Sequence, residues 1–175
     1  MELLKTMFTR KSVRSYTGKP LKQAEINLLL KAAFSAPVGG RQYDLMHLTV
    51  ITDKELLGEV DRCCAEMFGD PSISPLHNAP ALIVVSASGE MNADVASANT
   101  GAIVENMSLA ATDAGIGSLF VWGAMAAVRN NAELLAKFRL PEGYVIYGSM
   151  AAGETEEEFA EREIPADKIT VSYIG

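Results

Sequence analysis

The sequence predicts an α+β fold, in which a single mixed sheet is surrounded by helices. Three observations support this prediction. The 175 residues fit one ordinary domain, 1–175, without a linker or an internal repeat. The composition is 49% hydrophobic and 21% charged, which is typical of a chain that folds around a core. Helical and strand patterns are interleaved along the chain, but not as a regular βαβ series, so one mixed sheet is favoured over a doubly wound one.

The first part of the chain alternates helix and strand patterns. Residues 3–9 have the apolar spacing of a short helix. Residues 23–35 place their apolar side chains on one helical face, before Pro and Gly residues end the pattern. Residues 46–52 alternate and are β-branched, which predicts a strand. Thr52 followed by Glu55 resembles a capping box, so we expect a helix to begin there.

The middle of the chain contains the strongest patterns. Residues 67–80 are rich in Pro and Gly and predict a loop, which is a candidate lid. Residues 81–87 form a continuous apolar run, as in a strand covered on both faces. A long helix with many small residues is predicted over 93–114, closed by Gly115 at the position after its C-cap. A buried strand is predicted over 116–122.

The last third predicts a short helix at 130–138 and a strand at 144–151. Residues 168–174 also alternate as in a strand, but an acidic segment separates them from the other strands.

Charge and composition exclude several classes of function. The net charge of −7 and the pI near 4.9 oppose binding to nucleic acid and to anionic membranes. Neither a secretory signal nor an apolar run long enough to span a bilayer is recognisable, so we expect a cytoplasmic protein. Cys63 and Cys64 are adjacent in a helical pattern, where a disulfide is sterically poor, so two free thiols are expected.

Several common catalytic patterns are missing. Gly115 and Gly117 follow a helix and precede a strand, which is the wrong context for a dinucleotide-binding turn. No P-loop motif occurs. Ser149 lacks the second glycine of a nucleophile elbow. His47 and His77 have no supporting pattern of zinc ligands, so no metal site is expected.

The N-terminal region is basic in an otherwise acidic protein. Arg10-Lys11-Ser12-Val13-Arg14 combines two guanidinium groups and a hydroxyl at a predicted helix end. Such groups suit a phosphate monoester. A solvated basic turn explains the spacing equally well. The segment 154–163 is acidic and is interpreted first as a solvated surface.

Four motifs in this order resemble the nitroreductase family along the whole chain. They are the basic tract Arg10–Arg14, the Ala36–Gly40 turn, the Gly115–Gly123 strand with Trp122, and Gly153 followed by Arg162 and Lys168. The chain departs from the family pattern at Arg41, where Asn is common, and in the residues up to Leu45. It is also short for the family.

The resemblance implies a mainly antiparallel sheet in an intertwined homodimer, with FMN at the subunit interface. Arg10 and Ser12 would then hold the phosphate and ribityl chain, and Arg14 would lie near the pyrimidine ring. The amide of Gly123 or Ala124 would face flavin N5, and Arg162 would be a second phosphate ligand unless it is plain surface. The cofactor-binding residues implied in this way are Arg10, Lys11, Ser12, Arg14, Pro37, Val38, Gly39, Arg41, Trp122, Gly123, Ala124, Arg162 and Lys168.

The resemblance further implies a flavoenzyme that passes hydride from NAD(P)H to a small oxidised acceptor, a nitroaromatic, a quinone or a similar molecule, by a ping-pong mechanism. No side chain need act as a nucleophile, because the flavin carries the chemistry. The small-residue helix 93–114 and the strand 168–174 would pack against the partner, although the helix suits an ordinary core equally well. Other chemistry on the same fold (a dehalogenase, an enone reductase or a flavin-fragmenting enzyme) stays open, as does FMN binding without catalysis.

Overall fold

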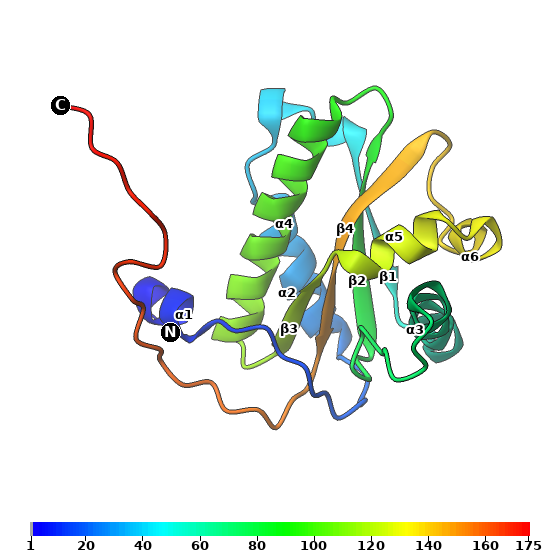
Figure 1. Ribbon diagram of the computed structural model, residues 1–175, viewed down its shortest axis with the longest axis horizontal. Helices are drawn as coiled ribbons and strands as arrows, with labels where there is room; N and C mark the ends of the chain where they lie inside the picture. Colours follow the sequence, from blue (N-terminus) through cyan, green and yellow to red (C-terminus); the bar gives the residue numbers. More distant parts are fainter. Residues whose placement is uncertain (1) are drawn as a thin grey trace.

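A computed structural model describes residues 2–175 (Figure 1). Its helices are α1 (Leu3–Thr9), α2 (Gln23–Phe34), α3 (Lys54–Phe68), α4 (Ala93–Asp113), α5 (Gly123–Arg129) and α6 (Ala132–Lys137), with 3₁₀ turns η1 (Gly39–Arg41) and η2 (Tyr43–Leu45). Its strands are β1 (Met46–Ile51), β2 (Ala81–Ser88), β3 (Gly117–Val121) and β4 (Tyr144–Gly153).

The four strands form one sheet in the order β1-β2-β4-β3. Every pairing among the described residues is antiparallel, so the sheet contains no parallel pair. Val84 of β2 lies opposite Thr49 of β1 and Ser149 of β4, which fixes the register at the centre of the sheet. A bulge interrupts the β2–β4 register between Val85 and Ser86. The predicted α+β class with a single, mainly antiparallel sheet is therefore confirmed.

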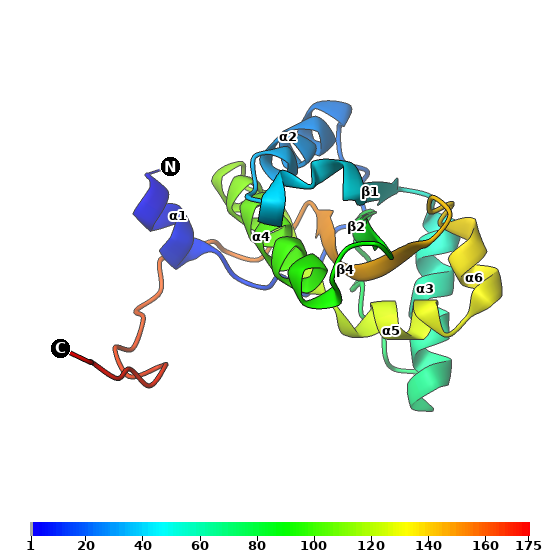
Figure 2. The same cartoon turned by 90° about the horizontal axis from the view of Figure 1, so that it is seen from above.

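Helices cover both faces of the sheet. The first seven residues of β2 are all buried, as the apolar run at 81–87 predicts. Ile83 and Val85 pack with α2 and α4, whereas Leu82 and Val84 pack with α3, α5 and α6. Figures 1 and 2 show the same three layers, with α2 and α4 on one side of the sheet and α3, α5 and α6 on the other. Alternate side chains of β2 thus join two separate cores.

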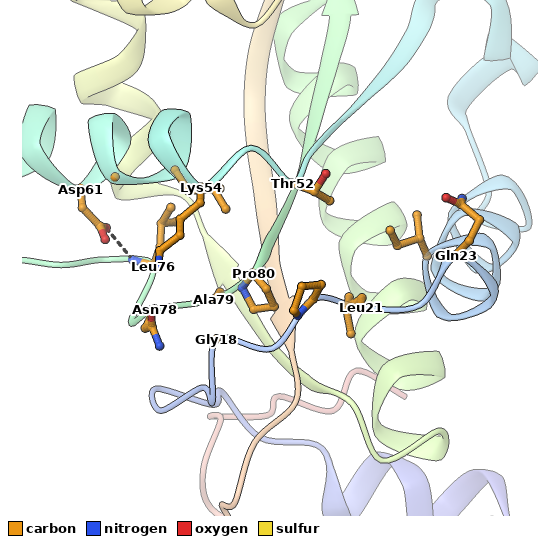
Figure 3. A pocket seen from close by; sticks show the side chains of 14 residues that line it. Gly18, Leu21, Gln23, Thr52, Lys54, Asp61, Leu76, Asn78, Ala79 and Pro80 are labelled. Atoms are coloured by element: carbon orange, nitrogen blue, oxygen red, sulfur yellow. Dashed lines mark hydrogen bonds between the residues drawn. The ribbon is translucent and has the colours of Figure 1, made fainter.

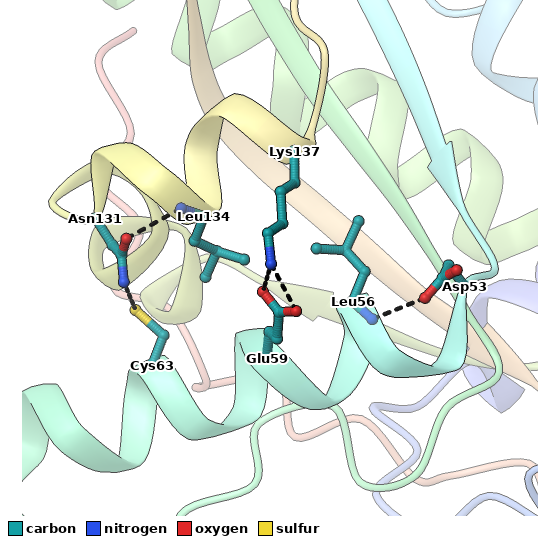
Figure 4. A network of polar contacts seen from close by, with 7 residues as sticks. All are labelled: Asp53, Leu56, Glu59, Cys63, Asn131, Leu134 and Lys137. Carbon is teal, nitrogen blue, oxygen red and sulfur yellow. Dashed lines mark hydrogen bonds and ion pairs between the residues drawn. The ribbon is translucent and has the colours of Figure 1, made fainter.

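Helix α3 begins one residue later than predicted. The N-cap is Asp53, whose Oδ1 accepts the Leu56 N–H at 2.9 Å, so the predicted Thr52 cap is wrong. A carboxylate accepts this bond more strongly than a hydroxyl and also favours the positive end of the helix. Figure 4 shows the cap and the ion pair of 2.6 Å between Glu59 Oε2 and Lys137 Nζ, which joins α3 to α6.

The long helix ends as predicted. The C-cap of α4 is Ala114, and Gly115 follows with a φ of +72°, a left-handed conformation that glycine adopts without steric cost. The N-cap of the helix is Asn92, whose Oδ1 accepts the Asp94 N–H at 2.9 Å.

Two predictions in the last third need correction. The helix predicted at 130–138 is α6, and the short helix α5 that precedes it was missed because its seven residues carry too few turns for a clear apolar period. Residues 168–174 do not form a strand in this chain, because no neighbouring strand lies beside them to accept their hydrogen bonds. Figures 1 and 2 show this tail running past α1, away from the sheet.

Both cysteines are free thiols, as predicted. Burial raises the pKa of the Cys64 thiol to about 11. Within residues 2–175, no helix combines the length and the apolar content needed to cross a membrane.

Candidate functional site

The basic tract crosses the beginning of β3. Arg10 is the C-cap of α1, and its N–H donates to Thr6 O at 2.8 Å. Val13 is completely buried in the core, and its N–H donates to Ser118 O of β3 at 2.9 Å. The buried valine fixes the middle of the tract, so its polar neighbours project from a rigid backbone rather than from a mobile turn.

Two basic side chains of the tract, Arg10 and Lys11, are paired with carboxylates. Arg10 Nε lies 3.0 Å from Glu105 Oε1 on α4. Lys11 Nζ lies 2.9 Å from Glu157 Oε2, and the backbone N–H of Arg14 donates to Glu157 Oε1 at 2.8 Å. Sequence reasoning missed both carboxylates, because Glu105 and Glu157 are far from the tract in sequence.

The acidic segment after β4 folds back along the tract. Thr155 Oγ1 donates to Ser15 O at 2.7 Å, and Lys19 Nζ lies 2.7 Å from Glu154 Oε1. The interpretation of this segment as plain solvated surface is therefore wrong for Glu157, which is half-buried, whereas Glu154, Glu156 and Glu158 are exposed as predicted. The opposite charges of the two segments were the available signal.

Arg162 lies beside the tract, as the family resemblance implies. Its Nε donates to Phe8 O at 3.1 Å and its Nη2 donates to Arg10 O. Lys168 is different: it lies on the exposed tail, and within residues 2–175 it makes no hydrogen bond or ion pair with the tract.

A cavity of about 260 Å³ brings two of the expected motifs together. Arg14 lines it from the tract, and Trp122, Gly123 and Ala124 line it from the end of β3 and the start of α5. Gly123 and Ala124 stand in the first helical turn, where backbone N–H groups have no acceptor within the helix. The other side chains on the wall include Phe68, Phe120 and His77, and the complete lining contains no carboxylate.

The turn after α2 does not join this cavity. Gly39 N–H donates to Asn99 Oδ1 at 2.9 Å, near the beginning of α4, whereas Arg10 pairs with Glu105, six residues further along. That separation corresponds to about 9 Å along a helix axis. Figure 1 likewise places the 39–45 turns at the end of α4 opposite to α1. Within one chain, Pro37, Val38, Gly39 and Arg41 therefore lie apart from the tract.

Arg41 itself adopts a left-handed conformation, with φ +59°, directly after Gly40 at φ +62°. Two successive left-handed residues make a tight turn that is uncommon for a side chain as large as arginine.

Two other cavities of about 430 Å³ lie away from the tract. One lies between the first turns of α2 and α3 and the loop ending at Pro80 (Figure 3), and it contains none of the predicted site residues. The other is an apolar hollow beside β1, and Val38 is the one predicted residue in its lining. Sequence reasoning gave no indication of either.

The residues around the tract fit a phosphorylated planar cofactor. Glu105 engages only Nε of Arg10, which leaves the terminal N–H groups of that guanidinium as donors. The Ser12 hydroxyl has no hydrogen-bond partner among residues 2–175. Groups that suit a phosphate therefore precede Arg14 along the tract, and Arg14 itself lines an aromatic cavity with unpaired backbone amides.

Comparison with known proteins agrees with this arrangement. Residues 7–154 match the Nitroreductase family. A protein of Archaeoglobus fulgidus named as an NADH dehydrogenase/NAD(P)H nitroreductase is 31% identical over 160 residues, which cover 90% of this chain and 87% of that protein.

Solved structures share the whole fold. A nitroreductase with bound FMN from Bacteroides fragilis matches with a TM-score of 0.84 and 26% identity, covering 99% of this chain and 100% of that one. A nitroreductase with bound FMN from Desulfitobacterium hafniense matches with the same TM-score, 25% identity and the same coverage.

Proposed function

The chain belongs to the nitroreductase family, and we propose that it uses FMN to pass hydride from NAD(P)H to a small oxidised acceptor, by a ping-pong mechanism. It is an FMN-dependent oxidoreductase. The observation that carries this proposal is the meeting of Arg14 with Trp122, Gly123 and Ala124 around one cavity, directly beside the phosphate donors of the tract.

The phosphate end of the cofactor belongs to the tract. Arg10 and Ser12 hold the phosphate and the ribityl chain. Arg162, from the acidic segment, supports them through its bonds to Phe8 O and Arg10 O. A guanidinium offers several N–H donors in one plane, which matches phosphate oxygens well. Lys168 stays a more distant member of this group, because the tail that carries it is exposed.

The ring end of the cofactor belongs to the cavity. Bound FMN supplies the hydride acceptor and donor atom, N5. The Arg14 cation stabilises the negative charge that the pyrimidine ring gains on reduction. The unpaired amides of Gly123 and Ala124 supply donors toward N5, and Trp122, 63% exposed, covers the ring edge.

The ping-pong order follows from the proposed use of one cavity. Its volume of about 260 Å³ is slightly below the usual range for small-molecule pockets, and the flavin ring takes up much of it. NAD(P)H and the acceptor would therefore share the same remaining access to N5 and bind in turn, so NAD(P)H leaves before the acceptor enters. A planar acceptor, a nitroaromatic or a quinone, suits the aromatic wall formed by Phe68 and Phe120.

We propose further that the active form is a homodimer with FMN at the interface. The tail exposes apolar side chains at alternate positions: Ile169 is 78% exposed, Val171 62% and Tyr173 93%. Among residues 2–175, strand β1 pairs with β2 and with no other strand, so it is an edge strand, and the apolar hollow lies beside it. An open edge is a template for another strand, so the tail of a partner subunit pairs here.

This arrangement also assigns the residues that lie apart within one chain. Pro37, Val38, Gly39 and Arg41 complete the cofactor site of the partner subunit rather than their own. Deleting residues 168–175 should yield a monomer with little bound FMN, as measured by light scattering and by the flavin absorbance of the purified protein. A deletion variant that stays dimeric would contradict the tail exchange.

The test of function is a visible spectrum after incubation with FMN, followed by anaerobic titration with NADH and with NADPH. We expect bound flavin that either nucleotide bleaches and that a nitroaromatic or a quinone reoxidises. Arg10→Ala should weaken FMN binding severely, whereas Arg62→Ala, an exposed arginine on α3, should not. Absence of bound flavin in the wild-type protein would contradict the proposal. Bound flavin that NAD(P)H does not reduce would favour an FMN-binding protein without this activity.

A further inference from the structure

One carboxylate, that of Glu157, connects the acidic segment 154–163 to the basic tract at two points. Glu157 Oε2 lies 2.9 Å from Lys11 Nζ, and Glu157 Oε1 accepts the backbone N–H of Arg14 at 2.8 Å. The two partners stand three residues apart and flank Ser12 and Val13. A single side chain therefore closes the loop that carries the Ser12 hydroxyl.

Glu157 is itself held in place by a neighbour in the acidic segment 154–163. Its N–H donates to Thr155 Oγ1 at 3.0 Å, and this hydroxyl donates to Ser15 O at 2.7 Å. The pKa of the Glu157 carboxyl is lowered, chiefly by its bond to Lys11 and next by the Arg14 amide. Glu157 is consequently ionised at neutral pH and remains available to both partners.

Val13 restrains the same loop from the opposite side. Its side chain is completely buried, and its N–H is bound to Ser118 O of β3. Between these two restraints, Ser12 and Arg14 have little conformational freedom before any cofactor arrives. Donors that are fixed in advance bind a ligand more tightly, because less entropy is lost on binding.

From this geometry we infer that Glu157 is a positioning residue: it presets the Lys11–Arg14 loop for the cofactor, and Lys11 acts through Glu157 instead of contacting the phosphate. The inference rests on the proposed FMN binding. The charges explain why Lys11 stays with Glu157. If Lys11 turned toward the phosphate, the Glu157 carboxylate would be left without a cation and close to the negatively charged phosphate. The Lys11–Glu157 pair is therefore retained when phosphate binds.

Two roles for Glu157 can be distinguished, because they predict opposite changes in FMN affinity when the carboxylate is removed. A carboxylate that merely sits near the phosphate repels it, so its removal would tighten FMN binding. A positioning carboxylate stabilises the bound shape of the loop, so its removal weakens binding. Loss of a charge-assisted hydrogen bond at a partly exposed position corresponds to roughly a tenfold change in the dissociation constant.

The experiment compares Glu157→Ala and Glu157→Gln with Glu158→Ala and Glu158→Gln in the full chain. Glu158 is exposed and makes no hydrogen bond or ion pair with residues 2–175, so its variants carry the same change of charge without loss of the contact. Apo-protein is titrated with FMN and with riboflavin, which lacks the phosphate. Hydrogen exchange of the Arg14 amide is measured on the apo-protein.

We expect Glu157→Ala to bind both FMN and riboflavin about tenfold more weakly and to exchange the Arg14 amide faster. Glu157→Gln keeps an acceptor for that amide and should recover part of the loss, which also covers the case in which the alanine variant does not fold. Lys11→Met should weaken both flavins by similar factors. The Glu158 variants should match the wild-type protein.

Equal or tighter FMN binding by Glu157→Ala than by Glu158→Ala would overturn the inference. A loss by Lys11→Met confined to FMN would also overturn it, because that result identifies a direct phosphate contact. If the wild-type protein binds neither flavin, the proposed function fails first, and the exchange data still report whether Glu157 holds the loop.

Discussion

Replacement of Gly117 by alanine tests the packing that supports the site. Gly117 begins β3, directly beneath the tract. A Cβ built at this position meets three carbon atoms, each at 3.0 Å: Val13 Cγ1, Tyr16 Cε1 and Thr155 Cγ2. Carbon atoms in contact prefer separations of about 3.5–4.0 Å, so three neighbours have to retreat by roughly half an ångström each.

None of the three neighbours moves easily. Val13 and Tyr16 are buried in the core, and Thr155 is bound to Ser15 O. Overpacking of this kind costs about 1–3 kcal/mol. The alanine regains about 0.4–1 kcal/mol by restricting the unfolded chain. We therefore expect Gly117→Ala to lower the free energy of unfolding by about 1–2 kcal/mol. It should also weaken FMN binding, because Val13 belongs to the basic tract and Thr155 to the acidic segment, and both would be displaced.

The assay is urea unfolding of the apo-protein at one fixed protein concentration, followed by circular dichroism. Gly58→Ala is the matched control. Gly58 lies inside α3, and the single atom near its Cβ position is Arg62 Nη1 at 3.6 Å, the end of a flexible side chain. This variant should gain about 0.5–1 kcal/mol from helix propensity. If Gly117→Ala is as stable as the wild-type protein, the basic tract and the acidic segment do not pack closely on β3.

Three further predictions concern stability. Phe138→Ala, which empties a side chain that is 1% exposed, should lower the free energy of unfolding by about 3–5 kcal/mol in the same urea assay, and a cost below about 1 kcal/mol would contradict its place in the core. Asp53→Ala should cost about 1 kcal/mol through loss of the α3 cap, whereas Thr52→Ala should change stability by less than about 0.5 kcal/mol; the reverse order would restore the Thr52 cap. The pKa of the Glu157 carboxyl is lowered from its ordinary value of 4.5, so its ion pair stabilises the folded protein above pH 4.5. This stabilisation is lost as the pH falls through the lowered pKa of the folded protein. The difference in thermal midpoint between wild type and Glu157→Gln should therefore shrink from pH 7 to pH 3. A difference that does not change with pH would show that the ion pair has no part in stability.

Most of the fold could be predicted from the sequence, because its strongest signals are local. The apolar run of β2 requires burial on both faces wherever it lies, and Gly115 ends α4 through its own backbone freedom. The signal fails where an element is short. Helix α5 has too few residues to show a period, and the cap of α3 depended on a choice between the adjacent residues Thr52 and Asp53.

Only part of the predicted set of site residues lies together in the structure, and the contacts among them were not predicted. The tract, the Trp122 region and Arg162 were all identified, and the fold brings them together. The carboxylates that neutralise the tract were missed, since Glu105 and Glu157 lie about 95 and 146 residues from their partners Arg10 and Lys11.

By itself, the sequence determined the local shape of the segments that carry the candidate site residues. Only the tertiary structure decided that Glu157 binds both Lys11 and Arg14 on either side of Ser12, and that Gly39 packs six residues nearer the beginning of α4 than Arg10 does. The reason is physical. Periodicity and capping act over a few residues, whereas the pairing of distant charges depends on how the chain packs around its two cores.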